Sequence, residues 1–239
     1  MKAYTLYIAL LAAVTFSFGS CSKKLDNWEY PASVVSGKFL YNGQPVLIMG
    51  TSSDVVGANM LQLSQTGPGK WDPGYIKMFA KEDGTYTINA FNGDYYLTIT
   101  PGRGPWMPNK DTIRFTLSEK KTDANFTVTP YFWMANYSSA FQDSVFTAKF
   151  DLQKVVPAAV LEKVVIQMSP TAIVDNVSKV YETSFASLVP GTNTISLNLK
   201  TLTLAQKSAI SKTGFTFARV GVKTAGATDL LYSPTMQLK

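Results

Sequence analysis

The sequence has no histidine and only one cysteine, Cys21. Without an imidazole group, Ser-His-Asp and Cys-His catalysis lack their general base. The common zinc sites also lose their usual ligands, because they draw on histidine or cysteine. A single thiol cannot form a disulfide within the chain, so the fold must be stabilised by packing. We therefore expect no metal and no cofactor, and the chemistry left open is carboxylate catalysis, a Ser-Lys pair or calcium binding through oxygen ligands.

The acidic residues offer little support for this remaining chemistry. Glycoside hydrolysis needs two carboxylates that flank a cleft, whereas Asp83, Asp94 and Asp123 occupy turn-like segments, where solvated carboxylates are common. The Asp-x-Asp-x-Asp pattern of a calcium loop does not occur. Ser118 and Lys121 have Ser-x-x-Lys spacing, but they fall in a charged turn between predicted strands and not at the start of a helix. We therefore expect that the protein is not an enzyme.

Charge is sparse as well. The chain has 22 Lys and Arg residues and 16 Asp and Glu residues, a formal net charge of +6, and its basic residues are scattered along strand-like segments. A nucleic-acid-binding protein is expected to gather its cations on one face. We therefore expect no nucleic-acid partner.

The N-terminal segment has the organisation of a lipoprotein signal peptide. A lysine follows the first residue, an apolar run covers about residues 6–18, and Gly19-Ser20 precedes Cys21. Small residues before a cysteine are typical of signal cleavage followed by acylation of that cysteine. The apolar run is shorter than the roughly 18–20 residues of a membrane-spanning helix. We expect residues 1–20 to be a signal peptide and residues 21–30 a tether lipidated at Cys21; ordinary secretion with an incidental Cys21 is the alternative.

From Ser33 onward, short runs of alternating apolar and polar residues are broken by turn dipeptides such as Asn42-Gly43 and Asn92-Gly93, a pattern typical of β-strands. One helix is predicted from Leu204 to Lys212, because Thr203 and Gln206 have the spacing of a capping box and Gly214 suits a helix stop. The predicted strands cover residues 33–40, 46–49, 61–64, 76–80, 86–90, 95–99, 113–117, 126–128, 146–150, 164–168, 180–185, 195–199, 215–224 and 231–238.

The strand pattern is interrupted in the aromatic and irregular segment 130–142, which begins with a proline. We expect this segment to separate two domains, a β-sandwich at 31–130 and a second β-sandwich at 131–239. The predicted fold class is therefore all-β, with two sandwiches in tandem and one short helix.

Four short motifs in the first predicted domain resemble those of the transthyretin-like sandwich that serves as a regulatory module beside carboxypeptidases. In that module, an Asp-Gly-x-Tyr turn starts a hairpin whose return strand opens with Gly-x-Tyr. The resemblance covers about residues 30–130, and it implies that the strands at 86–90 and 95–99 pair with each other. The four motifs are Ser36-Gly37-Lys38-Phe39, Gly43-Gln44-Pro45-Val46, Asp83-Gly84-Thr85-Tyr86 and Gly93-Asp94-Tyr95-Tyr96.

The whole chain is similar to a two-domain lipoprotein family of unknown function in Bacteroidota. The similarity rests on these motifs, on the lipoprotein start and on the Thr129-Pro130-Tyr131-Phe132 junction into the second domain, for which we expect an immunoglobulin-like sandwich. Members of that family tend to be encoded beside starch-utilisation-type systems that take up glycans across the outer membrane. The resemblance implies an outer-membrane lipoprotein, at the cell surface rather than on the periplasmic face, that is accessory to glycan capture. It carries no site motif over to this chain.

Two tryptophans stand in loops rich in proline and glycine, Trp71 in 67–74 and Trp106 in 102–108. An exposed indole on a loop is unfavourable unless it packs or binds a ligand, and sugar rings present apolar C–H faces that can stack on an indole. Nearby polar side chains can hydrogen-bond to sugar hydroxyls. For Trp106, the alternative is a loop anchor packed on the sandwich. The candidate glycan-binding residues are therefore Trp71, Trp106, Asp72, Arg103 and Asn109.

Two classes of function remain open. In the first, the protein is a non-catalytic lipoprotein that binds glycan through loop aromatics and works with the proteins of an outer-membrane uptake complex. In the second, it is a structural or assembly module that contacts protein partners of an envelope complex and binds no sugar. Exposure of Trp71 and Trp106 would favour the first class. Their burial, together with a flat apolar patch elsewhere, would favour the second. Trp133, in the segment between the domains, is predicted to fill the domain interface.

Overall fold

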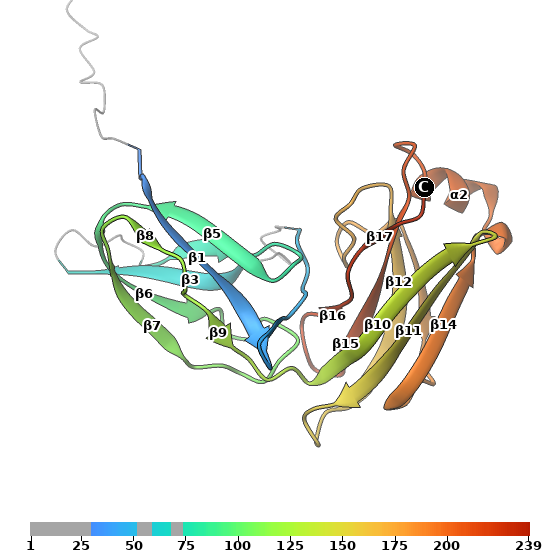
Figure 1. Cartoon of the computed structure of the whole chain (residues 1–239), viewed down its shortest axis with the longest axis horizontal. Helices are drawn as coiled ribbons and strands as arrows, with labels where there is room; N and C mark the ends of the chain where they lie inside the picture. The colour runs from blue at the N-terminus through green and yellow to red at the C-terminus, as the bar shows by residue number, and fades with distance from the viewer. Residues whose placement is uncertain (1–29, 52–58, 68–73) are drawn as a thin grey trace, which may run out of the picture. The chain divides into compact units, whose positions relative to one another are not determined.

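Strands dominate the structure and gather into four sheets (Figure 1). The computed structural model describes residues 30–51, 59–67 and 74–239. Within it, the four sheets form two β-sandwiches in tandem, which confirms the predicted fold class. Pro31–Lys239 belong to one compact unit. None of the helices in the described part of the chain has the length and apolar character that a membrane span requires.

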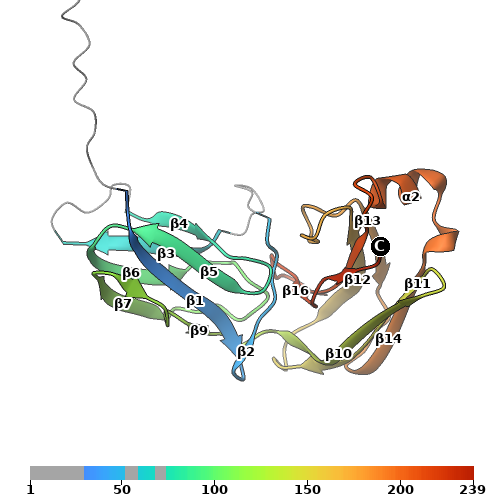
Figure 2. The same ribbon diagram turned by 45° about the horizontal axis from the view of Figure 1, so that its top comes forward.

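The first sheet of the first sandwich is built around strand β1. Asn42 and Gly43, with φ of 49° and 76°, make the tight turn from β1 to β2, which confirms the turn predicted from this dipeptide. Strands β2 and β5 pair with β1 in antiparallel fashion (Figure 2), and β8 and β9 pair with it in parallel (Figure 1). The strands are β1 (Ser33–Tyr41), β2 (Gln44–Pro45), β5 (Thr85–Ala90), β8 (Lys120–Lys121) and β9 (Phe126–Thr127).

The facing sheet has the strand order β4-β3-β6-β7, with antiparallel neighbours throughout. The prediction that a hairpin forms around Asn92-Gly93 is wrong, because β5 pairs with β1 whereas β6 pairs with β3 and β7. Both sheets of a sandwich need an apolar inner face, so Tyr86 of β5 and Tyr95 of β6 are buried from opposite sheets. The strands are β3 (Asn59–Thr66), β4 (Ile76–Phe79), β6 (Gly93–Ile99) and β7 (Thr112–Leu117).

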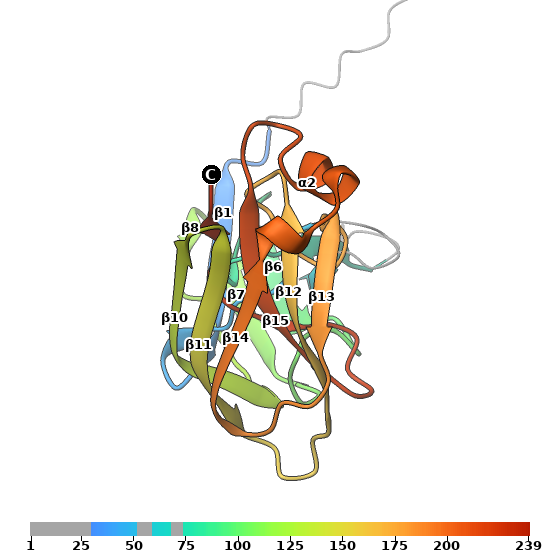
Figure 3. The same ribbon diagram turned by 90° about the vertical axis from the view of Figure 1, so that its right-hand side faces the viewer.

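The second sandwich packs a three-stranded sheet, β10-β11-β14, against a sheet of order β13-β12-β15-β16, in which β17 also pairs with β15 (Figures 1 and 3). All of its strand pairs are antiparallel. The strands are β10 (Phe132–Gln142), β11 (Val145–Lys154), β12 (Leu161–Ser169), β13 (Tyr181–Phe185), β14 (Gly191–Asn198), β15 (Phe217–Thr224), β16 (Leu231–Tyr232) and β17 (Met236–Gln237).

The predicted capping box is confirmed at the start of helix α2 (Leu204–Ile210). The Thr203 hydroxyl accepts a hydrogen bond from the Gln206 backbone N–H at 3.2 Å, and the Gln206 side chain accepts one from the Thr203 N–H at 2.9 Å. The helix ends at Ile210 instead of Lys212, before Gly214 takes a φ of 86°. A short 3-10 helix, η1 (Leu199–Thr201), precedes it and was not predicted.

Segment 130–142, predicted to be irregular, is mostly the long strand β10. A bulge shifts the β10–β11 register between Ala135 and Ser138, and Asn136 within it has a φ of 53°. A bulge inserts one residue into the strand, so the alternation of inward and outward side chains changes phase there. Because of this change of phase, the alternation in the sequence did not predict the strand that the structure contains.

The strand predicted at 46–49 is also absent, although Val46 and Ile48 are buried. The Ile48 N–H donates to the Glu82 carbonyl at 3.2 Å, whereas the Leu47 carbonyl accepts from the Tyr232 N–H at 3.1 Å. Consecutive residues thus bond to different segments, one in each sandwich, instead of to one neighbouring strand. Burial alone produced the strand-like pattern.

Strands β12 and β15 are buried on both faces. One face packs apolar side chains such as Val164 and Val220 into the second sandwich, but the other carries the polar side chains of Gln167 and Arg219, which are buried as well. A half-exposed strand would place such residues in water. Their burial marks the face of this sheet on which segments outside the sandwich core are packed.

Candidate functional site

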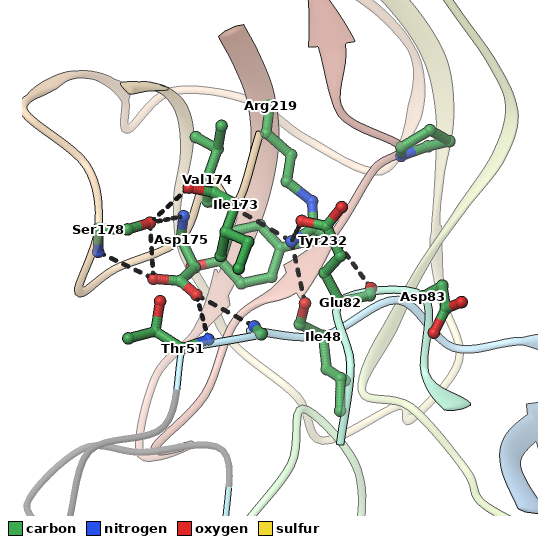
Figure 4. Close-up of polar contacts among 12 residues, drawn as sticks. Ile48, Thr51, Glu82, Asp83, Ile173, Val174, Asp175, Ser178, Arg219 and Tyr232 are labelled. Atoms are coloured by element: carbon green, nitrogen blue, oxygen red, sulfur yellow. Dashed lines mark hydrogen bonds and ion pairs between the residues drawn. The ribbon is translucent and has the colours of Figure 1, made fainter. Parts of the chain in front are cut away.

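Arg219, on β15, joins backbone segments of both sandwiches. Its side chain is only 1% exposed, and its guanidinium donates to four backbone carbonyls, of which Figure 4 shows those of Ile48, Val174 and Glu82. Nη1 donates to Ile48 at 2.9 Å and to Val174 at 3.3 Å, Nη2 donates to Glu82 at 2.9 Å, and Nε donates to Ser233 at 2.7 Å. Ile48 and Glu82 belong to the first sandwich. The planar fork of a guanidinium suits such a set of acceptors.

The Arg219 guanidinium also lies over the ring of Tyr232, 4.4 Å from its centroid. This stacking and the Asn176 N–H, which donates to the Tyr232 hydroxyl at 2.9 Å, hold the Tyr232 side chain in place. Burial raises the pKa of Tyr232, so the ring stays neutral at physiological pH. The Tyr232 side chain is therefore held in one position and carries no charge.

Glu82 lies beside this cation, with Oε2 at 3.8 Å from Arg219 Nη1. Burial raises the pKa of Glu82, and the charge of Arg219 opposes that rise only in part. Burial lowers the pKa of Arg219, and Glu82 is the largest of the groups that oppose that change. Each of the two charges therefore limits the effect of desolvation on the other.

Two buried carboxylates of the second sandwich accept hydrogen bonds from the first. Asp175 Oδ2 accepts from the backbone N–H of Gly50 at 3.0 Å and of Thr51 at 2.8 Å (Figure 4). Burial would raise the pKa of Asp175, but hydrogen bonds from Ser178, Thr51 and Val177 outweigh it and lower the pKa. Asp175 is therefore ionised at neutral pH and binds the backbone of the first sandwich as an anion.

Asp229 makes the second of these contacts. Its carboxylate accepts from Arg103 Nη2 at 2.9 Å and Nε at 3.1 Å, and from the Gly104 N–H at 2.6 Å. The Asp229 side chain is buried, and the two parallel Arg–carboxylate bonds are of the strong bidentate kind. Arg103, predicted to bind sugar hydroxyls, is thus engaged in an ion pair between the sandwiches.

A cleft of about 430 Å³ lies next to this network. Its volume is within the range of small-molecule sites, roughly 300–1,000 Å³. Tyr232 forms part of its wall, and the hydroxyl of Tyr137 is buried there without a hydrogen-bond partner among the described residues. The residues that line it come from both sandwiches and are uncharged: Gln44, Pro45, Leu47, Trp133, Met134, Ala135, Asn136, Tyr137, Leu231, Tyr232, Ser233 and Pro234.

Trp133 provides the aromatic face of the cleft. Its neighbours on β10, Phe132 and Met134, are buried in the core, whereas Trp133 points to the other side of the strand and is only partly buried. Its ring packs on Tyr41 of the first sandwich, with centroids 5.3 Å apart and planes inclined at 60°. Trp133 thus contacts the first sandwich, and it also leaves part of the indole accessible in the cleft.

The β10 bulge carries Asn136, which lines the cleft together with Trp133. Asn136 Nδ2 donates to Asp151 Oδ2 at 2.7 Å, and Thr192 Oγ1 donates to Asp151 Oδ1 at 2.6 Å. Both hydrogen bonds lower the pKa of Asp151, and the one from Thr192 has the larger effect. The cleft therefore combines an aromatic face with amide groups, and the carboxylate of Asp151 borders it through Asn136 without being among the described lining residues.

Trp106 lies in the core of the first sandwich and is 2% exposed. Its ring centroid is 4.8 Å from that of Phe39, and a bridge pairs its backbone with Pro130. Gly104 is packed so closely that a Cβ atom there would fall 2.0 Å from the indole. Because neither face of the Trp106 indole is open to a sugar, the hypothesis that Trp106 is a glycan platform is contradicted. Trp106 instead packs on the sandwich, as in the alternative of a loop anchor.

The other predicted site residues do not gather around Trp106. Asn109 is exposed, and its Nδ2 donates to Asp111 Oδ2 and to the Thr127 carbonyl, both at 3.1 Å. Neither Asn109 nor Arg103 is among the described residues that line the cleft. Trp71, Asp72 and Cys21 lie outside the described residues, so their roles stay predictions.

Sequence reasoning missed Arg219, Asn136 and Asp151. Arg219 stands in the otherwise apolar run Phe217–Val222, and an arginine in a strand with a buried pattern signals a buried polar contact. Asp151 and Asn136 carry no comparable signal, because the bulge that brings them together depends on tertiary pairing. In the part of the chain that the structure describes, no group of three or more Asp, Glu, Cys or His residues is placed to hold a metal ion.

Comparison with known domain families assigns almost the whole described chain. A domain described as "Protein of unknown function (DUF3823) N-terminal domain" matches residues 33–129, and one described as "Domain of unknown function (DUF3823_C)" matches residues 133–237. A comparison with curated proteins found no match.

Solved structures share both sandwiches. A DUF3823 family protein from Parabacteroides merdae is 33% identical, with a TM-score of 0.75, over 88% of this chain and 100% of its own. One from Bacteroides ovatus is 29% identical, with a TM-score of 0.70, over 87% and 100%. A protein from Bacteroides uniformis, described as a candidate carbohydrate binding protein, is 17% identical, with a TM-score of 0.67, over 87% and 99%. At that identity the likeness shows the fold alone.

Proposed function

This chain belongs to the DUF3823 family, and from that premise we propose that it is a non-catalytic, carbohydrate-binding lipoprotein of the outer membrane. The binding site that we propose is the cleft at Trp133, in place of the loop around Trp106. The same fold in a Bacteroides uniformis protein described as a candidate carbohydrate binding protein supports the proposal. On this view, the protein captures glycan for an outer-membrane uptake complex and performs no chemistry on it.

The observation that carries this proposal is the partly accessible Trp133 indole in an uncharged cleft with a polar rim. The indole offers the stacking surface that the C–H face of a sugar ring fits. Gln44 and Asn136 line the same cleft and supply amide groups for hydrogen bonds to sugar hydroxyls. Because Arg219 and Tyr232 fix one wall, little of the binding free energy is lost in ordering the site.

Replacing Trp133 by alanine is expected to weaken glycan binding by about two- to twelvefold, because an aromatic contact contributes about 0.5–1.5 kcal/mol beyond the area it buries. The measurement is retardation in affinity gels that contain starch, laminarin, mannan or galactan, followed by calorimetry with the polymer that retards most. Phe215→Ala is the matched control, because it removes an aromatic ring that is 53% exposed and does not line the cleft. Equal retardation of Trp133→Ala and the unaltered protein would rule out this cleft as the binding site.

Lipidation at Cys21 is the second part of the proposal. Cys21→Ala is expected to move the protein from the membrane fraction to the soluble fraction, because each buried acyl CH₂ contributes about 0.8 kcal/mol to membrane binding. Ser22→Ala serves as the control. Fractionation with labelled palmitate tests the anchor, and protease treatment of intact cells tests display at the cell surface. An unmodified Cys21 at the mature N-terminus would refute the anchor.

Two observations favour the second candidate function, assembly with a protein partner: Trp106 is buried, and a short apolar segment is exposed. Ile173, Val177 and Val180 are 44%, 41% and 47% exposed within one short segment between β12 and β13. Exposed apolar side chains that cluster in this way are typical of protein-binding surfaces. If none of the tested polymers retards the protein, assembly through this segment becomes the better explanation, and Val177→Asp would then be expected to release the protein from its envelope complex.

A further inference from the structure

We infer that the cleft selects uncharged sugars over acidic ones, and that Asp151 determines this selectivity; the inference rests on the proposed function. The described residues that line the cleft are all uncharged. An ionised uronate or sulfate group that entered it would lose hydration without gaining a cationic partner, which is unfavourable.

The nearest buried cation cannot supply that partner. Arg219 is 1% exposed, and its guanidinium is already bonded to four backbone carbonyls and stacked on Tyr232. An acidic sugar would have to break these contacts to reach it. The contacts that hold this wall of the cleft in place therefore also keep the positive charge of Arg219 inaccessible to a ligand.

Asp151 lies on β11, the strand that pairs with the Trp133 strand β10. In the β10–β11 register, Trp133 pairs with Gln153, Ala135 with Asp151 and Ser138 with Lys149. Directly opposed residues share a face of the sheet, so Asp151 is the first charged side chain on the Trp133 face of β11, and Lys149 lies beyond it. Lys154 pairs with Phe132, whose side chain is on the other face.

Asn136 and Thr192 hold this carboxylate in place, because Asn136 donates a hydrogen bond to one of its oxygens and Thr192 donates one to the other. A carboxylate has about four acceptor positions, so it can still accept hydrogen bonds from the hydroxyls of a neutral sugar on the indole. The same negative charge repels the carboxylate of a uronate within a Debye length, about 8 Å at physiological ionic strength. Asp151 is therefore a specificity-determining residue.

The test uses starch, laminarin, mannan and galactan, each compared with a derivative whose primary hydroxyls are oxidised to carboxylates. For the neutral polymer that binds best, we expect the oxidised form to bind roughly tenfold more weakly at low salt. This difference should shrink as salt is added, because screening weakens like-charge repulsion. Loss of a hydroxyl contact alone would give a difference that does not depend on salt.

Asp151→Asn is expected to reduce the neutral-to-oxidised affinity ratio several-fold, because it removes the charge and keeps an acceptor for Thr192. Asp123→Asn, at a surface carboxylate paired with Lys121 in the first sandwich, is the matched control and should leave the ratio unchanged. Thr192→Val loosens Asp151 without removing its charge, so it should keep most of the selectivity. This second variant separates an effect of charge from a general disturbance of the site.

The outcomes distinguish the two proposals. If the unaltered protein binds oxidised and neutral polymers equally, or if Asp151→Asn leaves the ratio unchanged, the charge selectivity is wrong and the glycan-binding function stands. If no polymer of either kind binds, the proposed function fails, and this inference fails with it. Salt-dependent preference for the neutral polymer, lost in Asp151→Asn alone, supports both.

Discussion

Replacing Arg219 by leucine is expected to lower the free energy of unfolding by about 3–5 kcal/mol, the range for removal of one partner from a buried charged network. The variant leaves the carbonyls of Ile48, Val174, Glu82 and Ser233 without their donor. Each buried carbonyl that finds no other partner costs about 1–3 kcal/mol. The large effect therefore comes mainly from the acceptors that remain, and less from the lost attraction between charges.

Urea unfolding followed by tryptophan fluorescence measures this effect. Arg114→Leu is the matched control, because Arg114 is an exposed arginine over the ring of Tyr96, 5.3 Å from its centroid, and such a contact contributes about 0.5–1 kcal/mol. Removing the charge of Arg219 should also raise the pKa of Glu82 further, because that charge opposes the effect of burial. A loss of stability no greater than that of Arg114→Leu would show that the network contributes little.

Replacing Trp106 by alanine is expected to destabilise the protein by about 3–5 kcal/mol, the usual cost of removing a buried large aromatic side chain. The indole is 2% exposed and packs on Phe39 and Gly104, so its removal leaves a cavity in the first sandwich. Trp106→Phe should cost less. It fills part of the space and removes the indole N–H, which is buried without a partner among the described residues.

Trp133→Ala is the matched control for Trp106→Ala, because both changes delete one indole. We expect a double dissociation: Trp106→Ala lowers the thermal midpoint and leaves glycan binding intact in the fraction that is folded, whereas Trp133→Ala weakens binding with a smaller loss of stability. The reason is that Trp133 is only partly buried, so less apolar surface leaves the core when it is removed. If the Trp106→Ala protein is stable but no longer binds glycan, the binding site lies in the 102–108 loop and not in the cleft.

The two tryptophans show the limit of local composition as a guide to the site. Trp106 stands among glycines and prolines, which predicts an exposed loop, but that loop folds back and its indole enters the core beside Phe39. Trp133 stands in a strongly apolar segment, which predicts burial, but the strand turns it toward the cleft. Whether an indole is exposed depends on which segments pack over it, and those segments are distant in the sequence.

Short-range patterns determined the fold class, most strand positions and the capped helix. Alternation at β11, positive-φ turns such as Asn42-Gly43 and the Thr203–Gln206 capping box act within a few residues, so their physical causes are contained in the local sequence. The N-terminal lipoprotein pattern is local in the same sense, and it predicts the cellular location of the protein without any knowledge of the fold.

Only the tertiary structure decided the strand partners and the site. The partner of β5 is β1 and not β6, because a sandwich is stabilised by burying the apolar faces of two sheets, and alternation is the same in either sheet. The partners of Arg219 lie in both sandwiches, and the carboxylate that Asn136 holds becomes its neighbour only through the β10 bulge. Hydrogen bonds and packing between residues far apart in the chain placed these groups, and a single sequence records no pairing between them.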